Sequence, residues 1–122
     1  MNESVIEHSV EYRAIADSIH EIRLSILATE TELLDQKDEL SYFESVLVLK
    51  AEGRNAEERK ANLVILCQDD EDFGAAQTKF RSLQHHMGIM QAWLEQEIAR
   101  QRLLGWLLRG HLMINGPSAD DA

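Results

Sequence analysis

The fold is decided by the stretch AEGRNAEERKA at residues 51–61, where one helix is signalled to end and another to begin. Gly53 directly follows a helical pattern, and glycine enters the left-handed conformation that ends many helices without a steric penalty. Asn55 is a preferred N-cap, and Glu58 stands three residues later, as in a capping box. A stop and a start this close together predict a hairpin or a corner between two helices.

Before this turn, apolar residues recur at alternating steps of three and four. Thr29 and Gln36 fill the two missing steps, and we interpret them as tolerated polar positions that help to fix the register. The pattern predicts a helix over about residues 5–52 that packs on a partner helix in coiled-coil fashion. The apolar members of this seam are Tyr12, Ile15, Ile19, Ile22, Ile26, Leu33, Leu40, Phe43 and Leu47.

After the turn, a short helix is predicted over about residues 56–68, with Leu63, Leu66 and Cys67 on its apolar face. Four consecutive acids follow at residues 69–72. We expect them to cap the next helix, with Asp70 or Asp72 as N-cap, rather than to bind a divalent cation, because the spaced acidic loop of a calcium site is missing.

The return helix is predicted over about residues 72–114. Gly88 and Gly105 should interrupt it without ending it, Gly110 is an early stop signal, and Asn115-Gly116-Pro117 is a firm one. Residues 117–122 are expected to be a disordered tail. The predicted seam slips after Leu94, as in a stutter, and it consists of Phe73, Ala76, Phe80, Leu83, Met87, Met90, Leu94, Ile98, Leu104 and Leu108.

These patterns predict an all-α fold: a long antiparallel helical hairpin, coiled-coil-like, with a short helix between the two long ones, forming a single domain over residues 1–116. Proline occurs once in the 122 residues and clusters of β-branched residues between turn signals are missing, which argues against a sheet. No stretch is apolar and long enough to span a membrane, and no signal peptide is evident. With one cysteine, this composition indicates a soluble cytoplasmic protein.

The formal net charge of −10 is unevenly distributed. Residues 1–50 carry 11 acids and 4 bases, whereas residues 73–122 carry 4 acids and 5 bases. One interpretation is that the two arms attract each other across the hairpin. The other is a weak basic stripe on the return arm for a polyanion, with the acidic arm facing elsewhere.

The end of the return helix is apolar around most of its circumference, more than one partner helix can cover. Its expected neighbour is the start of the first helix, at Val5, Ile6, Val10, Ile15 and Ile19. We expect the remaining surface to serve self-association first, a different protein partner second, and packing within the chain last. The candidate surface consists of Leu103, Trp106, Leu107, Leu112, Met113 and Ile114.

No catalytic constellation is evident. His85 and His86 point about 100° apart on a helix and chelate one ion poorly. Cys67 is interpreted as a small core residue. Glycine-rich phosphate loops and the common hydrolase motifs are missing. We therefore predict a protein that is not an enzyme, with no cofactor, no metal and no catalytic residue.

The run from Lys50 to Ala61, followed by the helix start at Asp72-Phe73, resembles small helical proteins of bacteriophages and prophages that are mostly of unknown function. The order of long, short and long helix also looks like phage recombination mediators of the UvsY type, by architecture only. Those proteins are oligomers that load a recombinase onto single-stranded DNA. The resemblance implies a bacterial host cell and phosphate contacts at Arg54, Arg59, Lys60, Lys79, Arg81, Arg100 and Arg102.

Three hypotheses follow. The first is a self-associating accessory protein in phage DNA recombination or replication, with a recombinase or single-stranded DNA as partner. A net charge of −10 opposes direct DNA binding, because nonspecific affinity comes from neutralised phosphates. The second is an acidic adaptor or inhibitor that binds a host protein as a DNA mimic. The third is a purely structural assembly protein.

Overall fold

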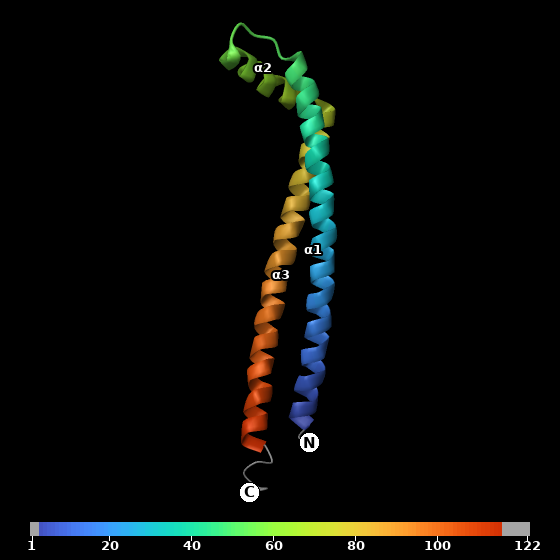
Figure 1. Cartoon of the computed structure of the whole chain (residues 1–122), viewed down its shortest axis with the longest axis vertical. Helices are drawn as coiled ribbons and strands as arrows, with labels where there is room; N and C mark the ends of the chain where they lie inside the picture. The colour runs from blue at the N-terminus through green and yellow to red at the C-terminus, as the bar shows by residue number, and fades with distance from the viewer. Residues whose placement is uncertain (1–2, 116–122) are drawn as a thin grey trace. The chain divides into compact units, whose positions relative to one another are not determined.

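The computed structural model describes residues 3–115, and side chains over residues 3–111. The described residues form three α-helices and no strand: α1 at Glu3–Lys50, α2 at Ala56–Asp69 and α3 at Glu71–Asn115 (Figure 1). This confirms the all-α fold with two long antiparallel helices and a short helix between them. The helix ends lie within two residues of the predicted ones, and α3 continues through Gly88, Gly105 and Gly110. The predicted tail lies outside the described residues.

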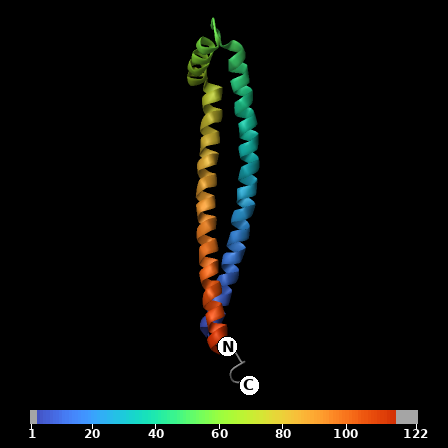
Figure 2. The same cartoon turned by 60° about the vertical axis from the view of Figure 1, so that its left-hand side comes forward.

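The chain divides by its contacts into two compact units. Unit 1 combines Met1–Ile26 with Ile89–Ala122, and unit 2 is the segment Leu27–Gly88. In each unit a stretch of α1 lies antiparallel beside a stretch of α3, which can be followed by colour in Figures 1 and 2. Unit 2 also contains α2. Each unit is described by itself below.

The predicted seam of α1, which we call the inner seam of that helix, is confirmed. All eleven positions from Tyr12 to Leu47 at steps of three and four are buried or half-buried, and the polar pair Thr29 and Gln36 is buried with them. Val5 and His8 continue the same spacing toward the N-terminus and are half-buried. The apolar period therefore located the packed face of α1 correctly.

The inner seam of α3 differs from the prediction after Leu94. There is no stutter: the buried or half-buried positions continue at regular steps through Glu97, Gln101, Leu104 and Leu108. Glu97 is only 7% exposed although it is charged. The apparent slip arose because apolar residues alone were counted, so that Ile98, beside the seam, stood in for Glu97.

Unit 1 has its core where Ile15 and Ile19 of α1 meet Leu104 of α3. Tyr12, Leu94 and Ile98 pack against this cluster. The expected contact between the two ends of the chain is thus present for Ile15 and Ile19. Ile6 and Val10 are exposed, which corrects the expectation that they cover the end of α3. They point away from the inner seam, one or two residues from its half-buried members Val5 and His8.

In unit 2, a buried polar residue of the α1 seam has a hydrogen-bond partner on α3. The Gln36 side chain is buried, and its Nε2 donates a hydrogen bond to the carbonyl oxygen of Ala76 on α3 at 3.2 Å. A one-step shift of either helix would leave that amide buried without this partner, which costs free energy. Gln36 therefore favours the observed register, in agreement with its interpretation as a register-fixing residue.

The turn before α2 has the predicted N-cap, but its glycine is needed for a different reason from the predicted one. Asn55 Oδ1 accepts a hydrogen bond from the backbone N–H of Glu58 at 2.9 Å, which confirms the N-cap. Gly53 is not left-handed, since none of the described glycines has a positive φ. A Cβ at Gly53 would lie 2.6 Å from the backbone nitrogen of Arg59, so glycine is required here for close approach.

The corner between α2 and α3 is a single residue. Asp70 ends α2, with its N–H bonded to the carbonyl oxygen of Leu66, and it also caps α3, where its Oδ2 accepts from the N–H of Phe73 at 2.8 Å. The N-cap is therefore Asp70 and not Asp72. One aspartate at extended backbone angles thus terminates one helix and starts the next.

Candidate interaction surface

A second face of α3 in unit 1 repeats at the same steps as the inner seam but points outward. It begins at Ile89 and Trp93, passes through the polar pair Gln96 and Arg100, and ends at apolar residues. We call this set the outer seam. Its members are Ile89, Trp93, Gln96, Arg100, Leu103 and Leu107.

The apolar members of the outer seam are about half-exposed. Trp93 is 50% exposed and Leu103 is 55% exposed, and Trp106, next to the seam, is 65% exposed. Side chains that recur every three to four residues lie on one face of a helix. Large exposed apolar faces are typical of sites that contact another surface, which makes this face the candidate interaction surface.

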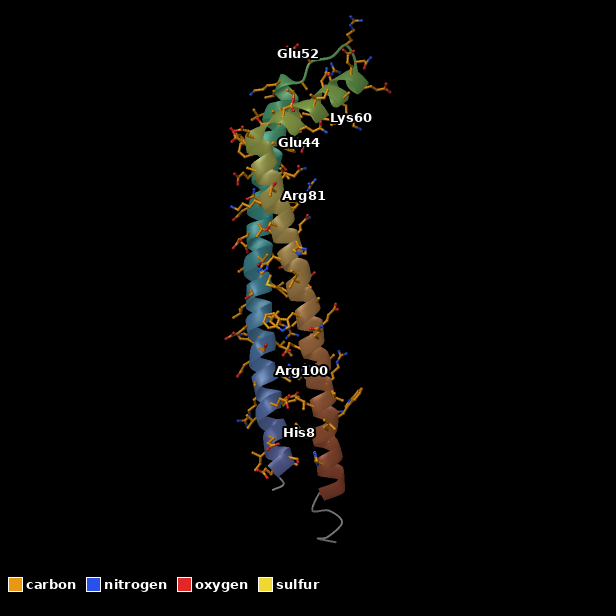
Figure 3. The ribbon with its side chains drawn as sticks, turned by 180° about the vertical axis from the view of Figure 1, so that it is seen from behind. His8, Glu44, Glu52, Lys60, Arg81 and Arg100 are labelled. Carbon is orange, nitrogen blue, oxygen red and sulfur yellow. The ribbon has the colours of Figure 1, made fainter. Side chains whose placement is uncertain are left out.

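Arg100 in the middle of the outer seam is paired within unit 1. Its guanidinium donates to Glu97 at 3.0 Å on the same helix and to Glu11 of α1 at 3.3 Å. Arg100 is labelled in Figure 3. The bond to Glu97 neutralises a carboxylate that the inner seam buries, whereas both side chains of the Glu11 pair are about half-exposed. Arg100 is therefore a structural cation that links both helices.

The structure also brings together two histidines that are far apart in the sequence. The rings of His8 on α1 and His111 on α3 lie 5.5 Å apart between centroids and are tilted by 38°. His8 continues the inner seam of α1 and His111 continues the inner seam of α3, but a search for apolar residues alone does not detect them. His8 Nδ1 is buried and has no hydrogen-bond partner among the described residues. The remaining histidines His20, His85 and His86 are exposed.

The structure describes the side chains of only part of the predicted oligomer surface. Leu103, Trp106 and Leu107 are exposed on α3 of unit 1, as a docking surface requires. The backbone of residues 112–114 belongs to α3, whereas the side chains of Leu112, Met113 and Ile114 lie outside the described residues. Ile89 and Trp93 extend the apolar face toward the middle of α3. Sequence reasoning missed them as part of it, because Arg100 and Gln96 interrupt the apolar run.

The candidate phosphate contacts are divided between the two units. Arg100 and Arg102 belong to unit 1, and Arg100 already carries two carboxylate partners. The other five, all exposed, belong to unit 2. Lys60 on α2 and Arg81 on α3 line one hollow together with Glu44 of α1, and all three are labelled in Figure 3. The remaining unit 2 cations are Arg54, Arg59 and Lys79.

Cys67 lines the same hollow of unit 2 and is half-buried rather than a core residue. No residue of α2 is fully buried, so the short helix covers its neighbours only partly. Burial raises the pKa of the Cys67 thiol, and the carboxylates of Glu44 and Asp70 raise the pKa further because they disfavour a second negative charge. The thiol is thus protonated and weakly nucleophilic at neutral pH.

Within the described residues, no group of three or more histidine, cysteine or acidic side chains is placed to hold a metal ion. The described helices also include none that is long and apolar enough to cross a membrane. Comparisons with protein-family models, with curated proteins and with solved structures give no match. The interaction surface must therefore be interpreted from its own geometry.

Proposed function

We propose that this chain is a non-enzymatic, self-associating helical protein whose association surface is the outer seam of α3 together with Trp106. The observation that carries the proposal is the exposure of these apolar side chains on a face separate from the inner seam. Complete burial of an exposed leucine or isoleucine side chain contributes about 1.5–3 kcal/mol, and the apolar side chains of this face have about half of their surface still to bury. A face with five such residues therefore has a strong tendency to dock on another helix.

The biological role that we propose is an accessory one in phage DNA recombination or replication. It is supported by the resemblance of the turn at residues 51–61 and by the order of the three helices. In this role the protein acts by assembling and by binding a recombinase, and any direct contact with DNA falls to the exposed cations of unit 2 and to Arg102 of unit 1. Arg100 is removed from the set of candidate phosphate contacts, because Glu97 and Glu11 already neutralise it.

A second candidate function, binding of a basic host protein, is favoured by the charge of α1 in unit 2. Residues 30–39 contain five exposed acids and one base, Lys37. Such a stretch of negative charge attracts a cationic surface and repels nucleic acid. A tight complex with a basic protein, in the absence of single-stranded DNA binding at low salt, would favour this function over the first.

The self-association is tested with a matched pair of single variants. Leu103→Glu places a charge in the outer seam, whereas Leu34→Glu places the same charge at a position on α1 of unit 2 that is 65% exposed. Sedimentation should show an oligomer for the wild type and for Leu34→Glu, and a monomer for Leu103→Glu with unchanged helical circular dichroism. An oligomer that persists unchanged in Leu103→Glu would contradict the proposed surface.

The DNA role is tested by titrating salt into complexes with a single-stranded oligonucleotide. If unit 2 cations contact phosphates, Arg59→Gln with Lys60→Gln should reduce the slope of log affinity against log salt by roughly 0.7 per lost contact. Arg100→Gln should leave that slope unchanged. No measurable binding of the wild-type protein at low salt, to DNA or to a recombinase, would remove recombination as its role.

A further inference from the structure

The outer seam has the same order of residue types in both directions along α3. From its centre near Ile98, each direction gives one polar residue followed by two apolar residues. Toward the N-terminus these are Gln96, Trp93 and Ile89. Toward the C-terminus they are Arg100, Leu103 and Leu107. A face that reads alike in both directions is complementary to itself when a second copy runs antiparallel, as a twofold-symmetric contact requires.

We infer that two copies of this chain associate by antiparallel packing of α3 on α3, with the twofold axis at the outer seam, level with residue 98 along the helix, an inference that rests on the proposed self-association. In this register Trp93 faces Leu103 of the second copy and Ile89 faces Leu107 of the second copy. Gln96 faces Arg100 of the second copy, where its side-chain carbonyl accepts from the guanidinium. Every apolar residue of the seam meets an apolar one and every polar residue meets a polar one.

Small residues beside the seam fit the same register. Ala99 lies two helical turns before Trp106 and Ala92 lies about four turns before it, both on the flank of the outer seam. In this register Ala99 lies two residues, about 3 Å along the axis, from Ala99 of the second copy, and the large indole of Trp106 lies the same distance along the axis from Ala92 of the second copy. Large side chains opposite small ones allow two helices to approach closely, because they fill the space that alanine leaves.

The charges near the axis are compatible with close approach. Each Arg100 brings its own Glu97 and Glu11, so the two guanidinium groups enter the interface already neutralised. A parallel arrangement would instead set Arg100 directly opposite Arg100 of the second copy, and like charges in one layer are destabilising. A shift by one heptad would set Trp93 opposite Gln96 of the second copy and Ile89 opposite Arg100 of the second copy.

The exposed area is adequate for a stable contact. Aromatic side chains bury roughly 150–250 Å² each, so the exposed halves of Trp93 and Trp106 offer roughly 200 Å² together. With Ile89, Leu103 and Leu107 the apolar face reaches the roughly 300–600 Å² that marks a functional patch on a monomer. The polar side chains between and beside them bring the contact toward the roughly 800 Å² per partner of a standard interface.

The register is measured with nitroxide labels on cysteine in a Cys67→Ser background, by pulsed electron–electron distances. Gly110→Cys is a suitable site, because a Cβ there meets no atom within 4 Å. At a helical rise of 1.5 Å per residue, the antiparallel register separates two labels at position 110 by about 36 Å along the axis. Two labels at Ala99→Cys, beside the twofold axis, should be separated by little more than the spacing of adjacent helices, about 8–10 Å, plus the label arms.

Other arrangements give distinct distances. Parallel packing makes both label pairs short, and a shift by one heptad moves the position 110 distance by about 10 Å in either direction. Either result, in a protein that sediments as an oligomer, would overturn this register and leave the proposed self-association intact. A protein that sediments as a monomer, in the wild-type and labelled forms alike, would overturn the proposed self-association and the register with it.

Discussion

Both units pack a stretch of α1 against a stretch of α3, but they differ in the surfaces that they leave exposed. Unit 1 closes its inner seam with an apolar cluster at Ile15, Ile19 and Leu104 and exposes a second, ordered apolar face on α3. Unit 2 places Thr29 and Gln36 in its seam and exposes Leu34 of α1 within a run of acids. The difference supports the proposal that unit 1 associates with another helix through α3, whereas the exposed acids on α1 of unit 2 favour water or a cationic surface.

The largest expected effect on stability comes from a substitution in the core of unit 1. Ile19→Ala removes a side chain that is 4% exposed and should lower the free energy of unfolding by about 2–5 kcal/mol, because it leaves a cavity. Leu34→Ala in unit 2 should change it by less than about 0.5 kcal/mol. Urea unfolding followed by circular dichroism measures both. Equal losses in the two variants would contradict the distinction between packed seam and exposed face.

A smaller effect is expected at the turn in unit 2. Gly53→Ala should destabilise by about 1–3 kcal/mol, since the added Cβ forces the backbone of Arg59 to move. Gly88→Ala, whose Cβ meets nothing within 4 Å inside α3, should instead stabilise by about 1 kcal/mol. If Gly53 is needed for close approach and not for its backbone conformation, thermal unfolding should give a lower melting temperature for Gly53→Ala and a higher one for Gly88→Ala. Stabilisation by Gly53→Ala would refute that reason.

The smallest effect concerns the ion pairs of unit 1. Arg100→Met deprives the buried Glu97 carboxylate of its partner and should cost about 1 kcal/mol. Glu11→Gln removes only a pair between half-exposed side chains, which contributes roughly 0–1 kcal/mol. Urea unfolding at neutral pH compares the two variants. A larger loss in Glu11→Gln than in Arg100→Met would show that Arg100 serves the contact with α1 more than it serves Glu97.

Much of the fold could be predicted because the apolar period and the caps are local signals. The seam of α1 and the cap at Asn55 needed no knowledge of neighbours. The seam of α3 was misread where Glu97 and Gln101 occupy it, because polar residues carry no apolar signal. The close approach at Gly53 depends on where Arg59 lies, which no stretch of sequence states.

The candidate surface was predictable in kind but not in extent. Leu103, Trp106 and Leu107 stood out as an apolar run, and the structure leaves all three exposed. Trp93 was not predicted to belong to the surface, because its membership of the outer seam depends on which face of α3 packs on α1. The pairing of His8 with His111 depends on the register between two helices that are far apart in sequence.

The most direct test of self-association through α3 is the mass of the wild-type chain in solution. Sedimentation equilibrium over a range of protein concentrations should give a mass that rises from one chain to two, because the outer seam is complementary to itself. The mass of the Leu103→Glu variant should stay at that of one chain over the same range of concentrations. A wild-type protein that stays at the mass of one chain at every concentration would contradict the account.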